Sequence, residues 1–140
     1  MSYSLVAIQF TMLIAVAVSG PIVASGFWLI LEVAAILLAI WAILTMRLGN
    51  FNVTPQPKKD ANLVQVAPYS WIRHPMYLSL ILGAAALVAN SFSWLRLFFW
   101  LVLIVDLVVK LNVEEQLLIR HFAGYEQLRQ HSWRLIPYVY

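Results

Sequence analysis

Apolar residues along this chain form four runs, which are separated by segments of polar or small residues. The runs cover residues 3–24, 27–46, 76–89 and 95–113. A helix that crosses a lipid bilayer needs about 20 consecutive, mostly apolar residues. The third run is shorter than this, and the other three reach it. The pattern predicts an all-α integral membrane bundle of about four transmembrane helices, of which the last two form a helical hairpin.

The first run allows two interpretations. It can be a secretory signal peptide, since the small residues Ala24-Ser25-Gly26 follow it. Signal peptides, however, begin with a positively charged region, and residues 1–4 carry no charged side chain. We therefore expect the run to be a retained transmembrane helix.

The composition agrees with a membrane protein. Hydrophobic residues make up 63% of the chain and charged residues 11%, whereas soluble domains carry roughly 25% charged residues. A soluble domain of 140 residues leaves too much of its surface exposed to hide so many apolar side chains. The few basic residues form no stripe of the kind that binds nucleic acid. The expected surroundings are membrane lipids.

The positive charges predict the orientation, because Lys and Arg are enriched in cytoplasmic loops. The polar segment 47–74 carries four of them and the tail after residue 113 carries three, whereas the 20–26 link has none. With four spans, both termini and the 47–74 loop are then cytoplasmic. The tail has a helical period, which favours a cytoplasmic helix at the membrane surface.

Two polar clusters, at residues 68–77 and 110–125, are predicted to meet because a helical hairpin joins them. In the first, Arg73-His74-Pro75 opens the third helix, where proline suits the first turn. A helix N-terminus favours anions, so this turn can hold a carboxylate or a phosphate. The alternative is structural, with Arg73 as a topology anchor and His74 as an interfacial cap.

The last predicted helix, which leads into the second cluster, carries a stripe of ionisable residues at Asp106, Lys110 and Glu114, spaced at i, i+4 and i+8. Such residues inside a span face a cavity or one another. The stripe therefore forms either a salt-bridge ladder or one wall of a polar pocket. Glu32, a lone acid in the second run, is expected to reach outward or to bond a neighbouring helix.

Several kinds of site are not expected. The chain has no cysteine, which removes thiol chemistry and Cys-ligated metals. The three histidines, His74, His121 and His131, lack the i, i+4 spacing of a helical zinc site, so no metal is predicted. The sequence also contains no Gly-rich dinucleotide motif.

The two clusters carry a longer pattern within residues 56–140. Its parts are Leu63-Val64, Pro68-Tyr69, Arg73-His74-Pro75-Met76-Tyr77, Glu114-Glu115-Gln116-Leu117-Leu118, Phe122-Ala123-Gly124-Tyr125 and Arg134-Leu135-Ile136-Pro137. This pattern resembles the isoprenylcysteine carboxyl methyltransferase family and its relatives, the phospholipid N-methyltransferases. The chain departs from the usual pattern at Ala67 and Ser79, where the family commonly has Gly, and at Lys110, where many members have Arg.

The resemblance implies a membrane-embedded methyltransferase that uses S-adenosylmethionine and releases S-adenosylhomocysteine. The cofactor would lie in a cytoplasm-facing pocket of residues 47–140, while residues 1–46 add two N-terminal spans to the same single domain. Carried over from the family motifs, the cofactor-binding residues are Gln56, Leu63, Val64, Tyr69, His74, Pro75, Met76, Tyr77 and Glu114.

The implied acceptor is lipid-like, prenylated or an isoprenoid carboxylate, because a pocket in the membrane suits a substrate whose tail lies in the bilayer. A carboxylate needs a cation to place it, and Lys110 or Arg134 can supply one. An amine acceptor would instead need a base, for which Glu115 or His74 is nearest. The predicted catalytic residues are Lys110, Glu115 and Arg134. The alternatives are a phospholipid or amine N-methyltransferase and a non-catalytic membrane protein that kept the fold.

Overall fold

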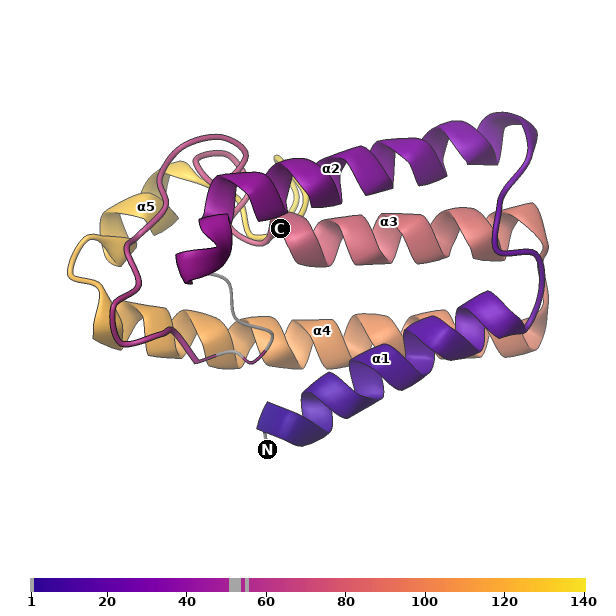
Figure 1. Ribbon diagram of the computed structural model, residues 1–140, viewed down its shortest axis with the longest axis horizontal. Helices are drawn as coiled ribbons and strands as arrows, with labels where there is room; N and C mark the ends of the chain where they lie inside the picture. Colours follow the sequence, from indigo (N-terminus) through magenta and orange to yellow (C-terminus); the bar gives the residue numbers. More distant parts are fainter. Residues whose placement is uncertain (1, 51–53, 55) are drawn as a thin grey trace.

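The computed structural model describes residues 2–50, 54 and 56–140. This part of the chain forms five helices and no strand, which confirms the all-α prediction (Figure 1). The helices are α1 (Ser2–Val18), α2 (Gly26–Asn50), α3 (Pro75–Asn90), α4 (Trp94–His121) and α5 (Tyr125–His131). α3 and α4 form the expected antiparallel hairpin, with α2 packed along α3 and α1 along α4.

The helix boundaries differ from the apolar runs in two places that matter for the site. α2 continues to Asn50, so the segment predicted as a loop from residue 47 begins with helix. α4 continues past the apolar run to His121. Residues 110–121 of the second polar cluster therefore continue α4 rather than forming a separate surface segment. The tail helix is the short α5.

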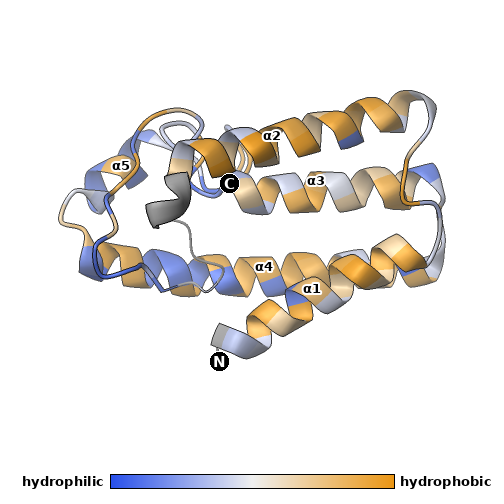
Figure 2. Ribbon diagram, viewed as in Figure 1, coloured by the Kyte–Doolittle hydropathy of each residue, from blue (hydrophilic) through white to orange (hydrophobic). Residues whose placement is uncertain are grey.

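By length and composition, one helix in the described part of the chain qualifies as a membrane span, at Gly26–Met46, against the four that the runs predicted. The apolar stretches Tyr3–Val18 and Pro75–Asn90 are shorter. α4 is long enough but contains Arg96, Asp106 and Lys110. Figure 2 shows that α2 is hydrophobic along most of its length, and most of its large apolar side chains are exposed.

The core lies between α1, α3 and α4. Its buried residues are Val16, Ala84, Val88, Leu103 and Leu107. A second cluster joins Leu78, Leu111 and Leu135, so the C-terminal tail packs onto the same hairpin. Apolar residues of the helices, together with Leu135 of the tail, form these clusters.

Arg96 is fully buried at the end of the molecule that carries the two short interhelical links. Its guanidinium donates to the carbonyl oxygens of Val16 (3.0 Å), Pro21 (2.8 Å) and Leu87 (2.7 Å). Carbonyl groups at helix C-termini have no helical partner, and their partial negative charge favours a cation. Arg96 thus joins the C-terminal ends of α1 and α3. Nothing in the apolar pattern predicts this role.

Glu32 takes neither of its two expected positions. Its Oε2 accepts a hydrogen bond from the backbone N–H of Ala24, at 2.7 Å. The carboxylate therefore fixes the link between α1 and its own helix, which is a structural role.

Candidate active site

A pocket lies at the opposite end of the hairpin, between the ends of α2, α3 and α4 and the segment that precedes α3. It holds a cavity of about 110 Å³ that is partly open to solvent. The structure brings together in its lining all nine residues predicted for the cofactor: Gln56, Leu63, Val64, Tyr69, His74, Pro75, Met76, Tyr77 and Glu114. These residues come from three separate segments of the chain.

The pocket also has lining residues that were not among those predicted for the cofactor, although Arg73 was considered for an anion at the start of α3. They are Met46, Thr54, Pro57, Ala61, Asn62, Arg73, Leu118, Phe122, Tyr125 and Leu128. Most are apolar and belong to the loop, to the end of α4 or to α5. Leu118 and Phe122 follow Glu114 at helical spacing, which is the one signal that could have pointed to them. The contribution of the others depends on how the loop and α5 fold back.

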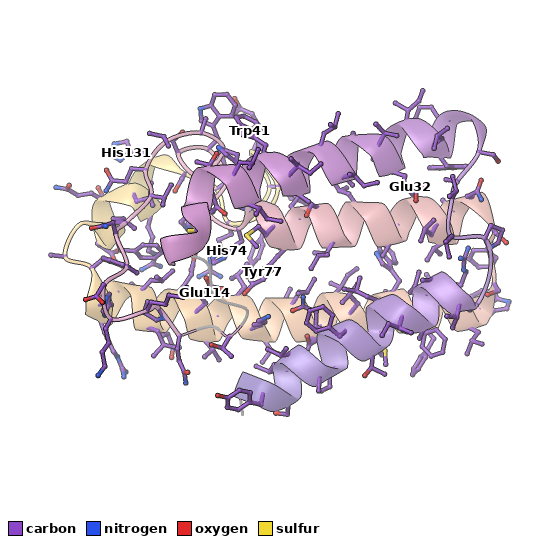
Figure 3. All side chains as sticks on the ribbon, in the orientation of Figure 1. Glu32, Trp41, His74, Tyr77, Glu114 and His131 are labelled. Carbon is purple, nitrogen blue, oxygen red and sulfur yellow. The ribbon has the colours of Figure 1, made fainter. Side chains whose placement is uncertain are left out.

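His74, Tyr77 and Glu114 form the polar wall of the pocket, where α3 begins beside α4 (Figure 3). The Tyr77 hydroxyl donates to Oε2 of Glu114 at 2.5 Å. The His74 ring is parallel to the Tyr77 ring, with centroids 5.4 Å apart. Nδ1 of His74 lies 3.9 Å from the same Glu114 oxygen. Glu114 is thus held in place while its side chain keeps 25% exposure.

Tyr69 ties the segment before α3 to α2, because its hydroxyl donates to the Ala42 carbonyl at 3.2 Å. Burial, with the nearby charge of Glu114, raises the pKa of Tyr69, which keeps the hydroxyl protonated as a donor.

Two of the departures from the family pattern, Ala67 and Ser79, lie in the same region. Thr45 donates to the Ala67 carbonyl at 3.5 Å, and the Ser79 hydroxyl donates to the Met76 carbonyl at 2.7 Å.

Glu115 is buried behind this wall and contacts three basic side chains. Its carboxylate lies 2.7 Å from Nε of Arg73, 3.0 Å from Arg134 and 3.4 Å from Nε2 of His74. Burial raises the pKa of Glu115, but hydrogen bonds from His74 and Arg73 and the charges of these residues outweigh it and lower the pKa to about 2. Glu115 is therefore ionised at neutral pH.

The C-terminal tail is fastened to the segment that enters α3. Backbone N–H groups of Arg73 and His74 donate to the carbonyls of Trp133 (2.8 Å) and Arg134 (3.1 Å), and Trp133 donates back to Trp71 (2.8 Å). The Arg73 guanidinium also donates to the carbonyl of Ser132. The tail thus places Arg134 beside Glu115, behind the polar wall of the pocket.

The three predicted catalytic residues, Lys110, Glu115 and Arg134, are near the pocket but outside its lining. The Lys110 ammonium is buried, 2.6 Å from Oε1 of Gln9, and it faces the Tyr77 ring at 5.4 Å from the centroid. The Arg134 guanidinium forms a salt bridge with Glu115 and donates a hydrogen bond to the Tyr140 hydroxyl, at 2.8 Å. Whether any of them serves the acceptor stays a prediction.

The stripe of Asp106, Lys110 and Glu114 on α4 is neither a salt-bridge ladder nor, as a whole, a wall of the pocket. Within the described residues, Asp106, Lys110 and Glu114 form no salt bridge with one another. Glu114 lines the pocket and Lys110 bonds Gln9. Both carboxylate oxygens of Asp106 are buried without a hydrogen-bond partner in that part of the chain.

The family model for isoprenylcysteine carboxyl methyltransferase (ICMT) matches residues 28–120, which is more than half of the chain. The chain belongs to this family. Membership indicates a membrane-associated, S-adenosylmethionine-dependent methyltransferase, as the resemblance implied. The match includes the first polar cluster and residues 110–120 of the second, but neither α1 nor α5. Among curated proteins and solved structures, none was found to match the chain.

Proposed function

We propose that this ICMT-family protein binds S-adenosylmethionine in the pocket between α2, α3 and α4 and methylates the carboxylate of a prenylated or isoprenoid acceptor. The observation that supports this best is that nine residues implied by the family motifs, from three segments, line a single pocket. Family membership supplies the reaction type. When bound, the cofactor supplies a methyl group on an already activated sulfonium.

The lining fits the parts of the cofactor. Leu63, Val64 and Phe122 offer an apolar slot for adenine. Glu114 can accept hydrogen bonds from an amine or from ribose hydroxyls. The first turn of α3, which starts at Pro75, presents backbone N–H groups that have no helical partner and that favour an anion such as a carboxylate. His74 lies at the same turn and adds a second donor.

Positioning supplies most of what this reaction needs from the protein. A carboxylate is already a nucleophile, and holding it in line with the methyl group replaces a bimolecular encounter. We assign the placing of the acceptor carboxylate to Lys110, whose ammonium is one helical turn from Glu114 and packs on Tyr77. Glu115 pairs with both Arg73 and Arg134, so we assign Glu115 and Arg134 to holding the pocket wall.

The charge distribution supports a cytoplasmic pocket. Exposed cations at the pocket end include Lys58, Lys59 and Arg120, and the basic residue at the other end, Arg96, is fully buried. Exposed tryptophans at the pocket end, Trp41 and Trp71, pack edge-to-face with centroids 6.1 Å apart. Tryptophan is enriched at membrane interfaces. An acceptor with its tail in the bilayer would therefore meet the cofactor at this interface.

The test is methyl transfer from radiolabelled S-adenosylmethionine by the protein in lipid nanodiscs. Acceptors are a prenyl-cysteine analogue with a free carboxylate, the same analogue as its amide, the water-soluble analogue without its prenyl chain, and phosphatidylethanolamine. We expect label on the free carboxylate and none on the amide. Transfer to phosphatidylethanolamine alone would replace the carboxylate by an amine acceptor, and transfer only to a water-soluble acceptor would overturn the lipid proposal.

A further inference from the structure

Gln9 is a buried polar residue in a helix that otherwise presents mainly apolar side chains. It is 6% exposed, and its Oε1 accepts a hydrogen bond from the Lys110 ammonium at 2.6 Å. The two residues are 101 positions apart and join α1 to α4. α1 lies outside the residues that the family model matches, so neither the motifs nor the match assigns Gln9 a role.

The Lys110 ammonium that Gln9 holds is connected to the pocket by two further contacts. Lys110 Nζ lies 5.4 Å from the centroid of the Tyr77 ring, within the range of a cation–π contact. The Tyr77 hydroxyl in turn donates to Glu114 at 2.5 Å, and Glu114 lines the pocket. A displacement of the ammonium would therefore change what supports Tyr77 and Glu114.

Asp106 is a competing partner for the same ammonium. It lies one turn before Lys110 on α4, and residues at i and i+4 on a helix can pair directly. Asp106 is 5% exposed, and within the described residues its two carboxylate oxygens have no hydrogen-bond partner. Without the Gln9 oxygen, the lysine would lose the partner that holds it at its present place and would be drawn toward Asp106.

We propose that Gln9 is a positioning residue of the methyltransferase: it holds the Lys110 ammonium against Tyr77 and thereby fixes the Tyr77–Glu114 hydrogen bond in the cofactor pocket. This inference rests on the proposed function, because cofactor binding by Glu114 is itself proposed. It makes α1 a part of the site rather than only a membrane anchor.

The first test compares S-adenosylhomocysteine affinity by calorimetry in detergent. Gln9→Leu, which removes the acceptor, is expected to weaken binding about tenfold, as for loss of a hydrogen bond to a charged group. Gln9→Asn, whose side chain is shorter, should also weaken S-adenosylhomocysteine binding. Gln9→Glu, which keeps an acceptor oxygen at the same length, should bind with the affinity of the unmodified protein. The matched control is Thr11→Val on the exposed face of α1, where the hydroxyl bonds its own helix at Ala7 (2.7 Å).

The second test asks whether Gln9 acts through Lys110. If it does, Gln9→Leu combined with Lys110→Met binds no more weakly than Lys110→Met alone, because the two changes remove one interaction. Additive losses would mean a general structural role and would overturn the inference. So would wild-type affinity in Gln9→Leu. Failure of the unmodified protein to bind S-adenosylhomocysteine at all would overturn the proposed function instead.

Discussion

At the scale of single residues, the adjacent acids Glu114 and Glu115 have opposite surroundings. Glu114 faces the pocket and bonds Tyr77, whereas Glu115 is buried among Arg73, His74 and Arg134. Successive residues on an α-helix point about 100° apart, since a turn takes 3.6 residues. One acid therefore reaches the pocket and the other reaches the wall behind it.

Glu114→Ala and His74→Ala are each expected to weaken S-adenosylhomocysteine binding by at least about tenfold, because each removes a polar group of the lining that is already held in place. Both variants should still insert into membranes. The matched control is Glu126→Ala on α5, an exposed acid that pairs with Arg129 at 3.0 Å. Calorimetry in detergent measures the effect, and wild-type binding by both lining variants would refute the site assignment.

Glu115 predicts a pH dependence of stability. Its pKa falls from 4.5 to about 2 on folding, so its ionised form stabilises the folded state. This contribution is complete above about pH 4.5 and is lost as the pH falls toward 2. We expect the melting temperature in detergent to fall over this interval. In Glu115→Gln, which cannot ionise, this part of the pH dependence should be absent; an unchanged profile would contradict the assignment.

At the scale of elements, the packing of α1 and α3 around Arg96 is the strongest constraint. Gly20 makes this packing possible, since a Cβ there would lie 2.8 Å from the Arg96 Cζ. The guanidinium cannot move away without losing its bonds to the ends of the two helices. The lack of a side chain at this one position therefore allows the first link to lie directly against the Arg96 guanidinium.

Gly20→Ala is accordingly expected to destabilise the protein by about 1–3 kcal/mol, the usual cost of overpacking. Gly83→Ala on α3 is the matched control, because a Cβ there would meet Ala35 at an ordinary 3.6 Å, and alanine favours a helix interior. Chemical denaturation in detergent compares the two. Equal stabilities would mean that Arg96 relaxes freely around the added methyl group.

At the scale of the whole molecule, the interhelical links and the pocket lie at opposite ends. The links bring Asn90 to the backbone and hydroxyl of Ser25, each at 2.9 Å. The pocket end carries the loop, α5 and the tail. This separation leaves the pocket at one end of the molecule, which is the end that we propose faces the cytoplasm.

The absence of cysteine from the sequence allows this orientation to be measured. Val23→Cys is exposed in the link end and Lys59→Cys in the pocket end. In intact cells, a membrane-impermeant maleimide is expected to label the first variant and to label the second only after permeabilisation. The reverse pattern would place the pocket outside the cytoplasm.

Much of the fold and of the site could be predicted from the sequence, because both depend on short, continuous segments of the chain. The apolar runs located α1 to α4 with shifted ends, since periodic apolar faces form helices wherever they find packing. Eight of the nine cofactor residues belong to contiguous motifs such as Arg73-His74-Pro75-Met76-Tyr77, and the resemblance to the family implied their role. The hairpin explains why Glu114 lies beside the other residues of the pocket.

Only the tertiary structure decided the partners of the buried charges. Lys110 bonds Gln9 rather than its helical neighbours, Arg96 joins two helix ends, and Glu115 holds the tail through Arg134. Burial makes each charge seek a compensating group, and the nearest such group lies on an element that is distant in sequence. The sequence therefore determined which residues are polar and which helices carry them, while packing determined what each of them contacts.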